Sequence, residues 1–598
     1  GRHASSVAPE VAAPVTPEPF ALPGSEQSAS ASLRSLVDRL AAGEPVVVVA
    51  TDLVVSARAL APITDDPFAA TSLLVRPASV EADVRVRHHL VTSVGSQHHQ
   101  VSAPDHRSVG ALRVAAPDAA AAALLVAELA DALADGTVAS DGSDLVELVA
   151  VAVTRGGISL RAIDMVDVPW FRAPADVSAA RAEAGSVPDE RIAQLQANRA
   201  DDGFYSTFVV RKASKPLTRL ALRIGWSPNT ITLLSFAIGI AAAVAFGQGS
   251  RWALVLGALL LQLSLVVDCV DGEVARATRR FSALGAWLDA STDRVKEFLA
   301  YAGLAIGAGR TGSDIWWLAV VLIVLQTTRH MSDYDFSRVQ RLREAYVPVL
   351  DVRVREDGAA GSTGGWSVSG AMEMSTRLNR RDAVRWAKRA IHLPIGERWL
   401  IISVVAAVLG PTWALSVLLV AGLLAFAYVT VGRSLRTLTW RGPTPAAGVA
   451  LLSRQADAGP LLSAIALVVP TRLRQRAWQN RAAWAVPPLL RFVELGIVAA
   501  VALAWYPAVT VIAFWWMALV AFHHYDTLYR AMQDAGSPRW ITWLGLGWEG
   551  RTIVVLVLAG IGATALSRGM TWGAWLMAAL FVVASSVQWL SVQSRGRS

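Results

Sequence analysis

The spacing of apolar residues changes from short alternating runs to long unbroken blocks near residue 229. Before this point, residues 46–55 predict a buried strand, residues 116–134 an Ala/Leu-rich helix, and residues 145–165 a helix, a Gly-Gly turn and a strand. Beyond it, the apolar blocks are about 20 residues long, the length of helix that crosses a bilayer. The pattern therefore predicts a polytopic α-helical membrane protein with an N-terminal soluble α/β domain.

Ten membrane-spanning helices are expected, six in a core and four more near the C-terminus. They are residues 230–247, 252–270, 284–308, 315–332, 397–410, 412–431, 486–505, 507–523, 550–566 and 571–592. The basic loops after the second, fourth and sixth spans fall on the same side as the N-terminal domain. Because basic loops stay on the cytoplasmic side, we expect the N-terminal domain in the cytoplasm and the protein in the plasma membrane. Residues 449–469 contain Arg454 and Asp457 and are expected to lie at the membrane interface.

The same pattern divides the chain into five parts. These are a disordered tail (1–32), a cytoplasmic α/β domain (33–185), a connector with an amphipathic helix (186–228), a membrane domain (229–440) with a polar insert (340–395), and a C-terminal membrane region (441–598). In residues 208–229, basic side chains alternate with Val, Leu and Ile at helical spacing. This favours an interfacial helix on the inner leaflet over a surface helix of the soluble domain.

Composition excludes a soluble cytosolic protein. Of the 598 residues, 54% are hydrophobic and only 17% are charged, with a mean hydropathy of +0.42. The net charge of +8 suits contact with anionic lipid, and no nucleic acid is expected because no basic stripe is interleaved with aromatic residues. Cys269 is the single cysteine, which excludes a disulfide framework and a thiolate metal cluster.

Four aspartates gather where the second span ends and the third begins. Asp268 and Asp271 are spaced i, i+3, and Asp289 and Asp293 are spaced i, i+4, so each pair lies on one face of its helix. A short loop joins the two helices, so the pairs can face each other. Intramembrane carboxylates need protonation or bound cations, and an all-oxygen cluster suits Mg²⁺, Mn²⁺ or Ca²⁺. Two such metals are a common clamp for phosphoryl transfer.

Small residues accompany the aspartates. Gly272 and Ala275 continue the face of the first pair, and Gly285 lies one turn before Asp289. Their lack of bulk would let a base and a pyrophosphate approach the backbone, although tight helix packing is an alternative for the glycines. Arg276 can bind a phosphate bidentately.

These residues follow the spacing D-x2-D-G-x2-A-R-x8-G-x3-D-x3-D over residues 268–293. This spacing resembles the signature of the CDP-alcohol phosphotransferase family of membrane enzymes, and the resemblance covers residues 204–440. Residues 202–219 and 392–403 resemble the branch that includes di-myo-inositol phosphate phosphate synthases and phosphatidylinositol phosphate synthases. The resemblance implies a six-helix core and two divalent cations, Mg²⁺ or Mn²⁺.

The resemblance also implies roles for individual residues. The donor would be a CDP-alcohol, such as CDP-diacylglycerol or a CDP-inositol-like compound, and the acceptor an alcohol or phosphoalcohol. Asp268, Asp271 and Asp289 would bind the metals, while Asp293 would bind metal and take the proton of the attacking hydroxyl, with release of CMP. The CDP moiety would contact Asp271, Gly272, Ala275, Arg276, Gly285 and Asn229. Asn229 is alternatively the cap of the first span.

Cations for a phosphorylated acceptor are less clearly marked. The candidates are Arg329, Arg338, Lys388, Arg389 and Arg398. Each of them is alternatively a positive-inside loop charge. Arg329 is favoured because it ends the fourth span, level with the aspartates.

The N-terminal domain resembles the nucleotidyltransferases that precede this membrane domain in some relatives. Asp52 and, more weakly, Asp167 match their metal-binding aspartates, but a Gly-rich loop for the triphosphate is missing. We therefore expect a degenerate domain, with an active cytidylyltransferase as the alternative. A cation-coupled transporter is disfavoured because the acids gather at one edge of the membrane.

The C-terminal spans carry no recognisable motif and are expected to serve dimerisation or lipid access, the protein being a homodimer. His523, His524 and Asp526 are close in sequence and are a possible metal site. A polar helix end at the membrane interface is the favoured interpretation of this cluster.

Overall fold

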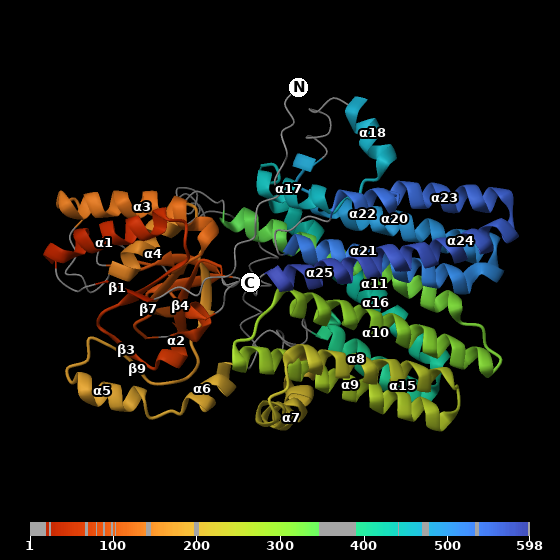
Figure 1. The fold of residues 1–598 in the computed structure, drawn as a ribbon, viewed down its shortest axis with the longest axis horizontal. Coiled ribbons are helices and arrows are strands. Elements are labelled where there is room, and N and C mark those ends of the chain that lie inside the picture. The colour runs from red at the N-terminus through yellow and green to blue at the C-terminus, as the bar shows by residue number, and fades with distance from the viewer. Residues whose placement is uncertain are drawn as a thin grey trace, which may run out of the picture.

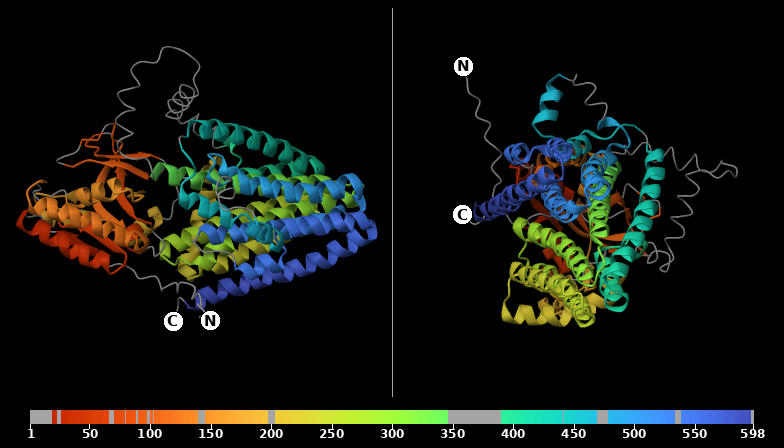
Figure 2. Two further views of the ribbon diagram at one scale, coloured as in Figure 1. Left: turned by 90° about the horizontal axis from the view of Figure 1, so that it is seen from above. Right: turned by 90° about the vertical axis from the view of Figure 1, so that its right-hand side faces the viewer.

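The computed structural model describes most of the chain. The described residues are 19–22, 26–65, 70–78, 80–87, 90–96, 100–101, 103–138, 145–196, 203–345, 390–440, 442–468, 478–532 and 538–595. The soluble domain lies at one end of a bundle of long helices (Figures 1 and 2). The predicted fold class, a polytopic helical membrane protein with an N-terminal α/β domain, is confirmed.

A seven-stranded mixed sheet forms the centre of the soluble domain. In spatial order its strands are β1 (Pro19–Leu22), β2 (Val46–Ala50), β7 (His106–Val114), β4 (Ser72–Pro77), β8 (Arg161–Asp164), β6 (Leu90–Val94) and β5 (Val84–Arg87). The helices on one face are α1 (Glu26–Ala41), α3 (Ala116–Ala134) and α4 (Leu145–Arg155), with α2 (Ala57–Thr64) and α6 (Asp189–Gln196) on the other. Strand β2 is buried on both faces. Val46 and Val48 pack in the core that α1, α3 and α4 cover, and Val47 packs in the core that α2 and α6 cover.

Two expectations for this domain need correction. The buried strand in residues 46–55 was predicted to end at Asp52, but β2 ends at Ala50, and after a turn at Thr51 and Asp52 a further strand, β3 (Leu53–Val55), pairs with β9 (Trp170–Arg172) in a separate two-stranded sheet. Part of the expected disordered tail is ordered: β1 and the first turns of α1 lie before residue 33, and Ala29 and Leu33 are buried in the core. The predicted helix at 116–134 is confirmed as α3.

The α/β domain ends with α5 (Val177–Ala184), and the connector contains α6 and the amphipathic helix α7 (Arg211–Ile224), which a short π-helical turn (Ser206–Val210) precedes. The soluble domain contacts the end of the bundle here. Arg58 donates a hydrogen bond to the Ala277 carbonyl (2.5 Å), and Arg279 donates to the Gln196 side chain (2.5 Å). Both contacts fall on the last turn of the second bundle helix, close to the aspartate motif.

The core of the bundle is built from six helices. They are α8 (Pro228–Gly247), α9 (Arg251–Thr278), α10 (Ala283–Arg310), α11 (Trp316–Ala345), α15 (Ile395–Leu409) and α16 (Pro411–Thr439). Helix α8 packs against both α9 and α10, and α15 packs against α9 and α16. The C-terminal helices lie along α10 and α11 (Figure 1).

Further helices and turns form the C-terminal region. They are α17 (Ala446–Arg454), α18 (Pro460–Val468), a 3-10 turn (Ala483–Ala485), α20 (Val486–Ala500) with a π-helical turn (Val501–Trp505), a 3-10 turn (Pro507–Val509), α21 (Thr510–Met532), α22 (Arg539–Leu544), α23 (Gly547–Ile561), α24 (Ala563–Met577), a π-helical turn (Ala578–Val583) and α25 (Ala584–Arg595). Gly562, with φ of +131°, separates α23 from α24. The expected span 550–566 therefore begins and ends several residues too late, and the expected span 571–592 begins several residues too late.

Seven helices of the described chain are long and apolar enough to cross a membrane. They are Pro228–Gly247, Arg251–Thr278, Pro411–Thr439, Ala483–Trp505, Pro507–Ala531, Trp540–Ile561 and Ala563–Leu590. The other three predicted spans form α10, α11 and α15, which do not meet this measure. Helices α10 and α11 carry several charged residues, and α15 has only 15 residues. The protein is a multi-pass membrane protein in which α10 and α11, inside the bundle, carry many of the charged side chains.

Two glycines of α10 bring its backbone against α8. A Cβ atom on Gly303 would overlap the carbonyl oxygen of Ala243, and one on Gly307 would overlap that of Phe246. Backbone atoms cannot move aside as side chains do, so only glycine fits at these positions. The close approach fixes α10 against α8.

Gly303→Ala is therefore expected to destabilise the protein. The added methyl group must push α10 from α8, and overpacking of this kind costs about 1–3 kcal/mol of the free energy of unfolding. Thermal unfolding in detergent measures the effect as a lower Tm. Gly309→Ala is the matched control on the same helix, because nothing lies within 4 Å of the position its Cβ would take. Equal Tm values for the two variants would contradict the packing argument.

Candidate active site

The four aspartates face one another across the hairpin of α9 and α10. Helix α9 ends with Arg279 in the left-handed conformation (φ +58°), and Ser282 caps α10 by accepting a hydrogen bond from the Gly285 amide (2.9 Å). The connecting segment is thus short enough to return the chain at once. Carboxylate oxygens of Asp268, Asp271 and Asp289 lie within 4.8 Å of one another. The predicted convergence of the two pairs is confirmed for these three residues.

Helix α8 orients the first pair. Thr232 donates a hydrogen bond from Oγ1 to Oδ2 of Asp271 (2.5 Å), and Ser235 donates to Oδ1 of Asp268 (3.0 Å). Each hydroxyl occupies one carboxylate oxygen and leaves the other available. The donor set is entirely oxygen, which fits a hard divalent cation.

Lys296 is a member of the site that the sequence analysis missed. Its ammonium lies 2.6 Å from Oδ1 of Asp268 and 3.1 Å from Oδ1 of Asp293, and it also donates to Ser235 (2.9 Å). The side chain is fully buried. One positive charge therefore joins the fourth aspartate to the first. The available signal was a lysine one turn after Asp293, on the helix expected to cross the membrane.

The predicted CDP-binding residues border the same site. Gly285 faces the start of α8, because a Cβ there would lie 2.9 Å from Oδ1 of Asn229. Ser227 is the cap of α8, accepting from the Thr230 amide (3.2 Å), so Asn229 is not the cap. The guanidinium of Arg276 folds over Gly272, 3.2 Å from the position of a Cβ. Ala275 lies between Gly272 and Arg276 on α9, and its carbonyl accepts a hydrogen bond from the backbone amide of Arg279 at the end of the helix.

The acceptor candidates separate into three groups. Arg329 is buried on α11 and donates from Nη2 to the carbonyls of His392 and Leu393, while its Nε and Nη1 have no hydrogen-bond partner among the described residues. Arg398 is bound bidentately by Glu297, at 2.8 and 3.0 Å. Arg338 is half-buried on α11. Lys388 and Arg389 lie outside the described residues.

The pairing of Arg398 corrects its assignment as an acceptor cation. Glu297 neutralises the guanidinium inside the protein, and Arg398 also donates to the Leu393 carbonyl (3.1 Å). An ion pair with this geometry is costly to open for a ligand. Arg398 therefore holds the segment before α15 that Arg329 also binds.

In the soluble domain, a guanidinium lies against Asp52, the residue predicted to bind a metal. Arg172 contacts both oxygens of Asp52 at 3.0 Å and Oε1 of Glu147 at 3.0 Å. Burial alone would lower the pKa of Arg172, but the carboxylates of Glu147 and Asp52 raise it above its ordinary value. Asp167 is exposed and pairs with Arg76. The guanidinium thus neutralises Asp52.

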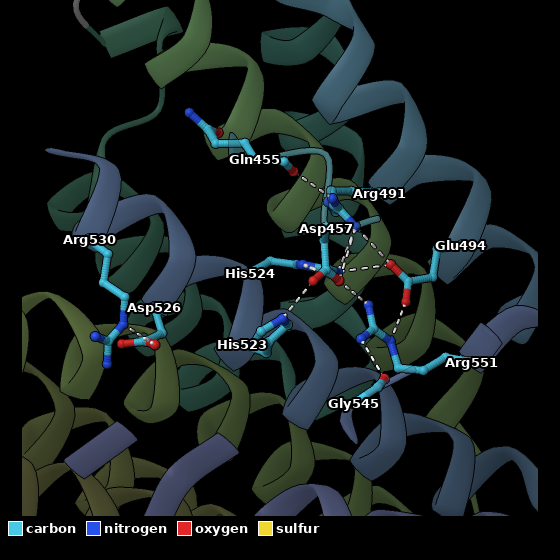
Figure 3. A network of polar contacts seen from close by, with 10 residues as sticks. All are labelled: Gln455, Asp457, Arg491, Glu494, His523, His524, Asp526, Arg530, Gly545 and Arg551. Atoms are coloured by element: carbon cyan, nitrogen blue, oxygen red, sulfur yellow. Dashed lines mark hydrogen bonds and ion pairs between the residues drawn. The ribbon is translucent and has the colours of Figure 1, made fainter. Parts of the chain in front are cut away.

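The C-terminal histidines do not form a helix end at the interface, and that interpretation was wrong. His523 and His524 are buried in α21, where His523 lies 3.0 Å from Oδ1 of Asp457 and His524 lies 2.8 Å from Oε2 of Glu494 (Figure 3). Asp526 points away from this network. Residues 449–469 are broken into α17 and α18 around Asp457, which has φ of +50° and is buried. Neither described helix is among those long and apolar enough to cross a membrane, in agreement with the prediction that this segment does not span it.

The long apolar helices make this a multi-pass membrane protein, and the carboxylates on one of its hairpins form a group that could hold a metal ion. Residues 226–339 match the family described as CDP-alcohol phosphatidyltransferase, and this part of the chain is a CDP-alcohol phosphatidyltransferase domain. Residues 446–596 match a family of unknown function, DUF5941. The predicted family is confirmed.

Similar proteins agree with this assignment. A bifunctional IPC transferase and DIPP synthase of Aquifex aeolicus is 31% identical over 159 residues, which are 25% of this chain and 34% of that protein. A phosphatidylinositol phosphate synthase of Mycobacteroides abscessus is 32% identical over 142 residues, 23% of this chain and 61% of that protein. An archaetidylinositol phosphate synthase of Aeropyrum pernix is 45% identical over 84 residues, 14% of this chain and 42% of that protein. The chain thus spans about a third of the length of the bifunctional relative.

Lys296→Met is expected to lower the Tm of the metal-free protein and to enlarge the rise in Tm on adding Mg²⁺ or Mn²⁺. Removing one partner of a buried ion pair costs about 3–5 kcal/mol, and here it leaves the carboxylates without their internal cation. A divalent ion then has more repulsion to relieve and no ammonium to displace. Thermal shifts in detergent with and without metal measure both effects. Lys212→Met, on the exposed face of α7, is the control, and a metal-induced shift in Lys296→Met equal to that of wild type would contradict the argument.

Proposed function

We propose that the protein transfers a phosphoalcohol group from a CDP-alcohol to the hydroxyl of an acceptor alcohol, with release of CMP. The observation that carries the proposal is the approach of carboxylates from α9 and α10 to within 4.8 Å of one another, inside the region that matches the phosphatidyltransferase family. The names of the relatives support a role in the synthesis of inositol-containing phospholipids or inositol phosphates. The donor and acceptor would then be a CDP-alcohol and an inositol-type alcohol.

The residues divide the work between metal binding and proton transfer. Asp268, Asp271 and Asp289 would hold two divalent cations, Mg²⁺ or Mn²⁺, which when bound neutralise the pyrophosphate and the departing CMP. Asp293 would complete the ligand set and accept the proton of the attacking hydroxyl. Its contact with Lys296 (3.1 Å) would hold the carboxylate in position for that proton transfer.

The nucleotide would lie beside the small residues. Gly272 and Gly285 leave the backbone of both helices accessible, and Arg276 provides a guanidinium next to Asp271 for a phosphate. Asn229, at the start of α8, would contact the nucleotide because its amide already faces Gly285. Ala275 would keep the intervening turn of α9 free of bulk.

The acceptor phosphate would bind Arg329. Two of its three guanidinium nitrogens lack a partner in the described chain, while the third anchors it to the segment before α15. A buried guanidinium with free N–H groups is suited to a phosphate monoester. The active site and the soluble domain would face the cytoplasm, as the loop charges indicate. The protein would be a homodimer in the plasma membrane.

Substitution of the aspartates tests this function. Asp289→Asn removes a metal ligand and is expected to abolish CMP release and weaken CDP-alcohol binding together. Asp293→Asn is expected to cut turnover by about 10²–10⁴ while largely preserving donor binding, since the other carboxylates still hold the metals. CMP release and calorimetric binding at saturating Mg²⁺ measure the two quantities.

Asp314→Asn is the matched control, because Asp314 is exposed at the other end of the bundle helices and caps the start of α11. It should behave as wild type. Near-normal CMP release by Asp289→Asn would refute the metal assignment. Loss of donor binding by Asp293→Asn as severe as that of Asp289→Asn would make Asp293 a structural ligand instead of a base.

A second activity, synthesis of the CDP-alcohol by the soluble domain, is not expected. The guanidinium of Arg172 occupies the oxygens of Asp52 that a metal would need. The full-length protein should release no pyrophosphate from CTP and a phosphorylated alcohol, and Asp52→Asn should leave CMP release from a CDP-alcohol unchanged. Metal-dependent pyrophosphate release above background, lost in Asp52→Asn, would show that the domain is active.

A further inference from the structure

One face of α10 is bound by the C-terminal region. Trp287, Ala290 and Arg294 are spaced i, i+3 and i+7 and so share a face, while Asp289 and Asp293 lie about a third of a turn around the helix from that face. The face with Trp287 packs against α21 and α25. The same helix therefore presents its metal ligands to α9 and its other side to a region outside the phosphatidyltransferase match.

Asp526 is the centre of this contact. The indole N–H groups of Trp287 and Trp589 both donate to its Oδ1, at 2.8 and 2.9 Å, and Arg530 donates to its Oδ2 at 2.8 Å. The two indoles stack with centroids 5.7 Å apart. All four residues are buried or nearly so, and Figure 3 shows Asp526 and Arg530 apart from the neighbouring histidine network. The carboxylate thus joins α10 to α25 through α21.

Two tyrosines of α21 extend the contact along α10. The Tyr529 hydroxyl donates to the Ala290 carbonyl (3.4 Å), and the guanidinium of Arg294 lies 5.7 Å from the centroid of the Tyr525 ring. Tyr525 also bonds to His330 of α11 (2.7 Å), whose ring lies 3.2 Å from Arg294. These contacts fall on successive turns of α10, beside Asp289 and Asp293.

The catalytic hairpin needs such support. The carboxylates of α9 and α10 repel one another, and Lys296 is their one ammonium partner among the described residues. Packing on α8 restrains α10 through Gly303 and Gly307, which lie well beyond the aspartates towards the far end of the helix. Near the aspartates, α10 contacts α8 through Lys296 and Ser235 (2.9 Å), and it contacts α21 through Trp287 and Asp526 (2.8 Å).

We propose that the C-terminal region positions α10 for metal binding, with Asp526 as the principal positioning residue. The proposal rests on the proposed function, since it takes the aspartates as metal ligands. Asp526 does not touch the substrate; it fixes Trp287, and through it the rotation of α10 that aims Asp289 at α9. Partners that orient metal ligands in this way typically contribute a factor of about 10–100 to metal affinity.

The test measures Mn²⁺ binding to the full-length protein in detergent, by the loss of the free-ion electron paramagnetic resonance signal, together with CMP release as a function of Mg²⁺. Asp526→Ala should weaken Mn²⁺ binding by about 10–100-fold, and high Mg²⁺ should restore part of its turnover. Trp287→Phe should also weaken Mn²⁺ binding and lower turnover, but by a smaller factor. Asp526→Asn, which keeps an oxygen for the two indoles, should retain more affinity than Asp526→Ala.

Glu549→Gln is the control for general destabilisation. Glu549 is buried in the same region on α23, where it accepts a hydrogen bond from the Leu462 amide (3.1 Å), and none of its described contacts reaches α10. It should lower the Tm without changing the Mn²⁺ affinity of the folded protein. Affinities of Glu549→Gln and Asp526→Ala that fall together would overturn the positioning role.

Unchanged Mn²⁺ affinity in Asp526→Ala and Trp287→Phe would also overturn the positioning role of Asp526. If Asp526→Ala does not fold, the Mn²⁺ affinity of Trp287→Phe alone decides the question. The proposed function fails separately, if wild type binds Mn²⁺ but releases no CMP from any CDP-alcohol. Wild-type Mn²⁺ affinity in Asp289→Asn would overturn the metal site and this positioning role together.

Discussion

Electrostatic repulsion between carboxylates is the constraint around which the membrane part of this protein is built. Three aspartates place oxygens within 4.8 Å of one another inside the helical bundle. Lys296 compensates part of this charge by joining Asp268 of α9 to Asp293 of α10. The remaining negative charge favours a bound divalent cation, which the proposed function requires.

The surrounding helices restrain the hairpin from different sides. Helix α8 provides hydroxyls to Asp268 and Asp271 and packs closely on the glycines of α10. Helix α21 binds the opposite face of α10, and the soluble domain contacts the last turn of α9. The regions on either side of the phosphatidyltransferase domain therefore both reach the hairpin that carries its aspartates. The C-terminal region is an integral part of the bundle and not an appended membrane anchor.

Buried charge is handled differently in the soluble and membrane parts. In the soluble domain, Arg172 neutralises Asp52 and Glu147, so a position that resembles a metal site is closed by a side chain. In the C-terminal region, Asp457 and Glu494 are likewise matched by Arg491 and Arg551. The aspartates of α9 and α10 have no arginine among their described ion pairs. Incomplete neutralisation thus distinguishes the candidate active site from the structural networks.

The sequence alone determined the fold class, the helix at 116–134 and the aspartate motif, because helical periodicity and residue spacing fix which side chains share a face of one element. Contacts between elements distant in sequence were decided only by the tertiary structure. Lys296 lies at the site because α9 brings Asp268 to it, and Arg398 is paired with Glu297 instead of facing a ligand. Asp526 contacts Trp287 of α10, away from His523 and His524. Neighbouring residues on a helix point in different directions, so the partner of each depends on which helix packs against that side.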